Sequence, residues 1–341
     1  MSSPATTETL EDFDEEPVRP ESPVAKKELT GRSPTRIALG RLAKDKVAVT
    51  CAVILFLMVA LALLAPVISN LLNIYRDYGD GKPNPREVLE FDGYPNTGPP
   101  YYPFDSAHPL GLEPNTGYDN LALLLYGTRT SLFIAFAATA FATIVGVTLG
   151  LIAGYAKGFL DSFLSFVIDF MLSFPFILGA LALAPIITTR FGSDTNTLGR
   201  AEFLSLVGVL VLFGWMGLAR LIRGQVLSLR EREFVQAARV IGVPTRQILF
   251  KELLPNLVAP IVVATSLALP GYVAAEAGLS FLGIGLSEGT SLGKTIQKAA
   301  DSFDVYPLYL WAPVVTIMVL VIALNLLGDS VRDAFDPKTR R

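Results

Sequence analysis

Residues 47–69 read VAVTCAVILFLMVALALLAPVIS and contain no charged side chain. A bilayer core about 30 Å thick needs roughly 20 apolar residues in a helix, so this stretch is long enough to cross it. It is also longer than the apolar segment of a cleaved signal peptide. We therefore expect a retained membrane helix here.

Five further apolar runs follow along the chain. They are Thr130–Tyr155, Phe159–Thr189, Phe203–Ala219, Leu257–Leu286 and Leu308–Leu327. The chain of 341 residues is 51% hydrophobic and only 17% charged, with a mean hydropathy of +0.48, which is too apolar for an ordinary soluble domain. The sequence predicts an all-α integral membrane protein with six transmembrane helices.

The charge distribution predicts no nucleic-acid partner. The net charge is −3, and the acidic excess gathers near the amino terminus in stretches such as Glu11–Glu16. Residues 1–31 are predicted to be a disordered acidic cytoplasmic tail. Cys51 is the only cysteine and His108 the only histidine, so neither an internal disulfide nor a Cys/His metal site is expected.

Lysine and arginine concentrate before the first apolar run, between the fourth and fifth, and after the sixth. The positive-inside rule then places both termini in the cytoplasm. The predicted division is an amphipathic segment with the first helix over 32–70, an extended external loop over 71–128, and a core over 129–341.

The longest inner connection covers residues 230–256. Apolar or small residues at spacings of three and four predict a short helix over Glu231–Val240, which Gly242 can end. Pro244 suits the start of a second helical turn, so the loop is predicted to bend between two helices. These physical features fit two interpretations, a loop that docks onto another protein and a loop that rests on lipid headgroups.

The loop contains Gln236-Ala237-Ala238, then Gly242, Ile248 and Leu254-Pro255. This pattern resembles the membrane permeases of ATP-binding-cassette (ABC) importers, in which Glu usually occupies the first position. The resemblance implies a coupling helix that seats in a groove of a nucleotide-binding subunit, and residues 230–256 are therefore called the coupling loop. The implied ATPase-coupling residues are Glu233, Gln236, Ala237, Ala238, Arg239, Gly242, Ile248, Leu254 and Pro255.

Other motifs narrow the resemblance. They are His108–Gly111, Leu125–Leu132, Asp169–Pro175, Leu229–Val235, Glu276–Gly283 and Gly328–Pro337. Together they cover about two-thirds of the chain with gaps, and they look like the second (C-type) permease subunit of dipeptide and oligopeptide importers. Leu292 departs from the family's usual Trp, and the loop after Gly111 also differs.

The resemblance implies a non-enzymatic transport subunit in the inner (cytoplasmic) membrane that forms half of a peptide pathway. Its implied partners are a second permease in a heterodimer, two ATPases that bind ATP and Mg, an external solute-binding protein and membrane lipid. No cofactor, metal ligand or catalytic residue is expected on this chain. Open alternatives are an ion-gradient-driven secondary transporter and an ABC permease for nickel chelates or oligosaccharides.

Two acidic residues fall deep inside apolar runs. Asp169 and Glu276 are candidates for lining a pathway or for hydrogen bonding between helices, because ionisable groups in a membrane rarely face lipid. Gly146, Gly150 and Gly154 form a small-residue stripe that predicts close helix packing.

Overall fold

The structure is a computed structural model that describes residues 34–76, 87–99, 102–191, 195–286 and 289–336. The predicted acidic tail, residues 1–31, lies outside the described residues. Within the described ranges the chain is almost entirely helical, and its only strand-like pairings are two isolated bridges.

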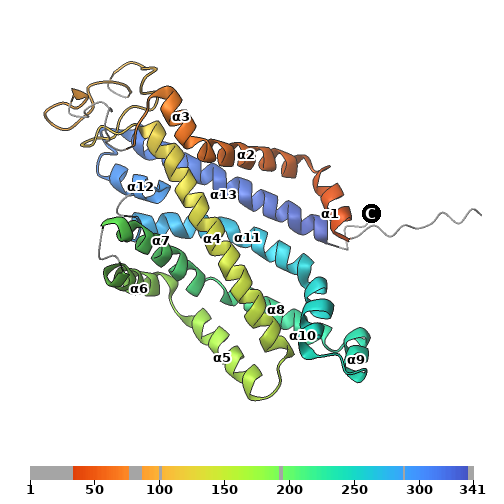
Figure 1. Cartoon of the computed structure of the whole chain (residues 1–341). Helices are drawn as coiled ribbons and strands as arrows, with labels where there is room; N and C mark the ends of the chain where they lie inside the picture. Colours follow the sequence, from red (N-terminus) through yellow and green to blue (C-terminus); the bar gives the residue numbers. More distant parts are fainter. Residues whose placement is uncertain (1–33, 77–86, 100–101, 192–194, 287–288, 337–341) are drawn as a thin grey trace, which may run out of the picture. The chain divides into compact units, whose positions relative to one another are not determined.

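Figure 1 shows the helices in chain order. The shorter ones are α1 (Pro34–Leu42), α3 (Ala65–Leu72), α9 (Glu233–Val240), α10 (Thr245–Gln247), the π-helical segment η2 (Ile248–Leu253) and α12 (Leu292–Ala300). The longer ones are α2 (Lys46–Leu63), α4 (Asn120–Tyr155), α5 (Phe159–Ser173), α6 (Phe176–Phe191), α7 (Thr195–Leu212), α8 (Met216–Leu229), α11 (Leu254–Phe281) and α13 (Pro307–Phe335).

The predicted all-α membrane architecture is confirmed. Among the described residues, five helical segments are long and apolar enough to cross a bilayer, and the pair α5 and α6 makes a sixth, broken span. These two helices meet at an angle of 93°. The third apolar run therefore forms a bent pair of helices and not the single helix that its continuous apolar composition suggested.

The bend has a local cause at Phe174 and Pro175. Proline disfavours helical geometry in the residue before it, and Phe174 is extended, with φ −79° and ψ 130°. Because Pro175 also lacks a backbone N–H, the hydrogen-bond ladder of α5 cannot continue through it.

Helix α4 is the longest helix and begins at Asn120, well before the predicted Thr130. Arg129 interrupts the apolar run but not the helix. Close packing of the glycine stripe is confirmed, because a Cβ at Gly150 would lie 2.7 Å from the Ala219 carbonyl oxygen, and a Cβ at Gly154 would lie 2.6 Å from Val226 Cβ. Glycine thus lets α4 and α8 meet backbone to backbone.

The fourth span combines α7 and α8 over Leu198–Leu229 and extends beyond the predicted end at Ala219. A short break at Gly214 separates the two helices, and a Cβ there would lie 2.0 Å from the Tyr272 hydroxyl oxygen. Arg220 and Arg223, predicted to follow the span, instead lie within α8.

The two ends of the described chain meet. Arg41 in α1 donates from Nη1 to the carbonyl oxygens of Ala334 and Asp336, at 3.4 and 3.3 Å. Helices α1 and α13 also lie side by side (Figure 1). Both ends therefore lie on the same side of the bundle, as an even number of spans requires.

In its described residues, 73–76, 87–99 and 102–119, the segment between α3 and α4 is held mainly by side-chain contacts. Asp119 accepts hydrogen bonds from His108 Nδ1 at 2.6 Å and from the Tyr75 backbone N–H at 2.9 Å. Tyr306, at the start of α13, donates its hydroxyl to the Pro99 carbonyl oxygen at 2.7 Å. This segment is thus fixed to the ends of α4 and α13.

The His108–Asp119 contact should make stability depend on pH. The hydrogen bond to Asp119 raises the pKa of His108 above 6.5, although partial burial opposes this effect. The stability that this raised pKa gives to the folded state is fully present below about pH 6.5. It is lost as pH rises through the pKa that His108 has in the folded state. We expect the thermal midpoint of the wild type to exceed that of His108→Gln by a few degrees at pH 5.5, and by less at pH 8.5. A gap that is constant with pH would contradict the assignment.

Candidate functional site: the coupling loop

Charged residues in the first and last turns stabilise helix α9, and a glycine ends it. Glu233 lies in its first turn and Arg239 in its last, and both favour the helix dipole. Gly242 follows at φ +80°, where a side chain would be strained. Its N–H bonds the Arg239 carbonyl, and the Val243 N–H bonds the Ala238 carbonyl, which closes the helix end in a Schellman arrangement.

Beyond this turn the chain returns to the membrane. Pro244 precedes α10, and the segment η2 leads directly into α11, with the Leu254 N–H bonded to the Leu249 carbonyl five residues back. Pro255 is the second residue of α11, directly after the π-helical segment. The loop is thus a helix, a bend and a second helix, as the sequence indicated.

One face of the loop packs against the transmembrane helices. Val235 and Ala238 from α9 join Ile248 and Leu253 from η2 in an apolar cluster with residues of α4, α8 and α11. Ala238 is only 7% exposed. This inner face fixes the loop to the bundle.

The opposite face of α9 is open. The exposed apolar face consists of Phe234, Ala237, Val240 and Ile241. Val240 and Ile241 are 86% and 78% exposed, which is unusual for two adjacent branched apolar side chains on a polar segment. The two alanines of the motif thus have different environments, because Ala237 lies on the open face and Ala238 on the packed one.

Polar contacts hold α9 and the turn before it to the end of α4. Arg239 donates from Nε to the Tyr155 hydroxyl at 3.2 Å, and its guanidinium lies 4.8 Å from the centre of the Tyr155 ring. Arg230 donates to the Gly154 and Ala156 carbonyls at 3.0 and 3.4 Å. The sequence did not point to Tyr155 or Arg230, since nothing in their local pattern links residues so far apart in the chain.

The side-chain amide of Gln236 donates two hydrogen bonds within the loop. Its Nε2 donates to the Arg230 carbonyl at 3.1 Å and to Glu231 Oε2 at 3.3 Å. A glutamate carboxylate could donate neither bond. The departure from the usual Glu therefore has a local structural reason in this chain.

The two acidic candidates inside the membrane occupy different environments. Glu276 is fully buried and accepts a hydrogen bond from Ser280 at 2.8 Å, with Ser131 and Ser291 beside it. Asp169 is exposed and pairs with Arg220 at 2.5 Å. The two carboxylates thus have different partners, serine hydroxyls for Glu276 and an arginine for Asp169.

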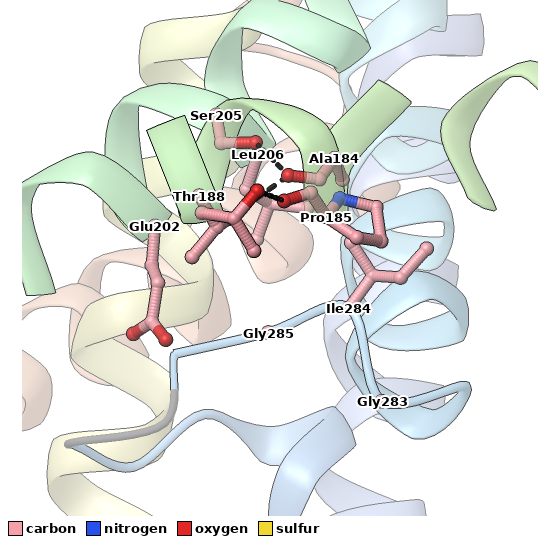
Figure 2. A pocket seen from close by; sticks show the side chains of 10 residues that line it. Ala184, Pro185, Thr188, Glu202, Ser205, Leu206, Gly283, Ile284 and Gly285 are labelled. Carbon is pink, nitrogen blue, oxygen red and sulfur yellow. Dashed lines mark hydrogen bonds between the residues drawn. The ribbon is translucent and has the colours of Figure 1, made fainter. Parts of the chain in front are cut away.

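A separate pocket of about 240 Å³ lies between α6, α7 and the segment after α11 (Figure 2). Thr188 and Ser205 both donate to the Ala184 carbonyl, at 2.9 and 3.2 Å, and Glu202 points toward the Gly283–Gly285 segment. Ligand pockets usually measure about 300–1,000 Å³. This pocket is too small for a peptide, so we assign no substrate to it.

The six candidate spans of the described residues, one of them broken, and a loop with an open apolar face are features of a multi-pass membrane protein. Residues 146–341 match the family described as "Binding-protein-dependent transport system inner membrane component", and residues 33–84 match "N-terminal TM domain of oligopeptide transport permease C". The chain belongs to this family of inner membrane transport components.

Similar proteins agree with this assignment. The chain is 32% identical to the oligopeptide transport system permease protein OppC of Salmonella typhimurium over 100% of both chains. It is also 32% identical to the dipeptide transport system permease protein DppC of Alkalihalophilus pseudofirmus, over 94% of this chain and 95% of that one. The MetNI methionine ABC transporter, solved in inward-facing conformations, shares the fold with a TM-score of 0.51 at 20% identity, covering 63% of this chain and 96% of that one.

Proposed function

We propose that this chain is the C-type permease subunit of an ABC importer for peptides and forms half of the translocation pathway. Full-length similarity to oligopeptide and dipeptide permeases supports the peptide substrate. A second, different permease supplies the other half. Two ATPases bind ATP and Mg, and an external binding protein delivers the peptide.

The open apolar face of α9 is the observation that carries this proposal. A helix fixed to the bundle on one face and exposed on the other can transmit a push from a bound protein, because the inner face moves with α4, α8 and α11. The proposed coupling residues are Glu233, Ala237, Arg239 and Gly242 on α9 and its turn, with Gln236, Ala238, Ile248, Leu254 and Pro255 shaping the loop behind them.

Both termini are proposed to be cytoplasmic, on the same side as the coupling loop. The contact of Arg41 with the end of α13 places the ends of the described chain together, and the basic segments of the sequence fall on that side. The domain division proposed from the sequence follows: an acidic tail over 1–31, the first helix over 32–70, an external loop over 71–128 and the permease core over 129–341.

The proposal is tested with the complete complex reconstituted in lipid vesicles. Uptake of a labelled tripeptide should require the binding protein outside and ATP at the ATPase side, and unlabelled peptides should compete for it. Uptake that survives ATP depletion but collapses with the proton gradient would indicate a secondary transporter. Competition by nickel chelates or oligosaccharides, but not by peptides, would replace the substrate class.

A further inference from the structure

An apolar groove of about 420 Å³ runs between α2 and α13, which lie side by side (Figure 1). Among the described residues that line it, only Lys46 carries a charge. Its walls include Val47 and Ile54 of α2 and Val319, Ile322 and Leu326 of α13. The groove therefore combines a cation with a hydrocarbon-like surface.

Lys46 lies where the apolar parts of both helices end. It is the first residue of α2, and the charge-free run of that helix begins at Val47. Asp45, directly before it, accepts hydrogen bonds from the Val47 N–H at 2.9 Å and from the Ser330 side chain of α13. The charged residues at the end of α13 begin at Asp329. The membrane boundary thus falls at one level on the two helices, and the groove starts there.

The length of the groove matches one leaflet of a bilayer. It follows α2 from Lys46 to Ile54, which is about 12 Å along a helix. The hydrocarbon of one leaflet is about 15 Å thick, half of the bilayer core. An acyl chain whose headgroup lies at Lys46 would therefore occupy the whole groove.

The walls of the groove do not have the character of a helix–helix contact. Helices that associate in membranes favour small residues at the contact. The exposed surface of α2 instead carries large side chains such as Phe56 and Leu57. Small residues are exposed on α11, where Gly271, Ala274 and Gly278 lie, and a Cβ at either glycine would meet no atom within 4 Å. A helix of the second permease fits that surface better than it fits the groove.

The charge at the end of the groove is available to an anion. Lys46 is exposed and forms no ion pair within the described ranges of the chain, even with Asp329 at the same level. Lys44 is also exposed, in the turn before α2, and adds positive charge there. Basic pockets between membrane helices bind lipid headgroups, because the phosphate is attracted to the cation while the chains stay in hydrocarbon.

We propose that the groove between α2 and α13 binds one phospholipid. Its acyl chain fills the apolar groove, and its phosphate accepts hydrogen bonds from the Lys46 ammonium group. The bound lipid contacts both helices along the groove and so strengthens the attachment of the first span to the bundle. The site is independent of the solute that is transported.

The first test measures the phospholipid that the assembled complex retains. Native mass spectrometry after addition of phosphatidylglycerol should show a tightly held lipid, and Lys46→Gln should lower its retention about fivefold, as expected for one lysine near a headgroup. Lys157→Gln is the matched control, because it removes the same charge at an exposed position in the connection between α4 and α5. Equal retention by these two variants would overturn the proposal. Displacement of the lipid by inorganic phosphate would show an anion site without an acyl chain and would also overturn it.

The second test fills the groove. Thr50 is exposed and lines the groove, so Thr50→Trp should fold normally and lower lipid retention. Val49→Trp places the same side chain on α2 outside the groove, at a position that is 44% exposed, and should retain the lipid. Size-exclusion chromatography checks that both variants assemble. Equal lipid retention by both would contradict the proposal, and loss of the second permease from the Thr50→Trp complex would show that the partner, and not a lipid, covers the groove.

Discussion

Replacing Ile241 by Asp is expected to abolish ATP-driven uptake while the permease still inserts and folds. Ile241 is 78% exposed next to the end of α9, so the charge does not disturb the packing of this chain. In the assembled transporter it would place a carboxylate against the ATPase surface without a partner. Central interface residues contribute about 2 kcal/mol or more, which corresponds to roughly a 30-fold loss of docking affinity.

The measurement is peptide uptake by vesicles, together with co-purification of the ATPase subunits. Lys157→Asp is the matched control, because it places the same carboxylate at an exposed position in the connection between α4 and α5, outside the coupling loop. We expect that variant to retain the ATPases. Normal uptake by Ile241→Asp would mean that α9 does not dock through its open face.

Replacing Gly150 by Leu should prevent stable folding. A Cβ at this position would already lie 2.7 Å from the Ala219 carbonyl oxygen and 2.8 Å from Ile222 Cβ, both on α8, so the two helices must separate. Overpacking of this kind costs about 1–3 kcal/mol, and here it also opens the apolar cluster that supports the coupling loop. We expect a large fall in detergent-stable protein and in its thermal midpoint, measured by fluorescence-detected size-exclusion chromatography.

Gly208→Leu on α7 is the control for this substitution. It introduces the same side chain into a membrane helix, but a Cβ there meets no atom within 4 Å. Equal destabilisation by both variants would show that the glycine stripe does not determine the α4–α8 distance.

The sequence predicted those features that depend on local composition. Apolar length located the spans, and the proline and glycine of the coupling loop located its bend. The break at Phe174 was missed because apolar composition continues through Pro175, although the proline itself was the available signal. The extension of α8 past Ala219 was missed because Arg220 and Arg223 look like the end of a span until Asp169 and Asp161 are seen beside them.

Features that depend on tertiary contact could not be predicted. Adjacent alanines look equivalent in the sequence. Only the packing of α9 against Leu151, Ile222 and their neighbours makes Ala238 buried and leaves Ala237 exposed. The bond from Arg239 to Tyr155 likewise joins residues 84 positions apart. Such pairs become visible only when the helices are placed in space.

The π-helical segment η2 connects the coupling loop to α11. A π-helix contains more residues per turn than an α-helix, and each residue of an α-helix rotates the chain by about 100° and advances it by 1.5 Å. Relaxation of η2 to α-helical geometry would therefore rotate α9 about the axis of α11 without breaking the long helix that follows Leu254. A π-to-α change in η2 would thus couple a small shift along the helix axis to a rotation of α9.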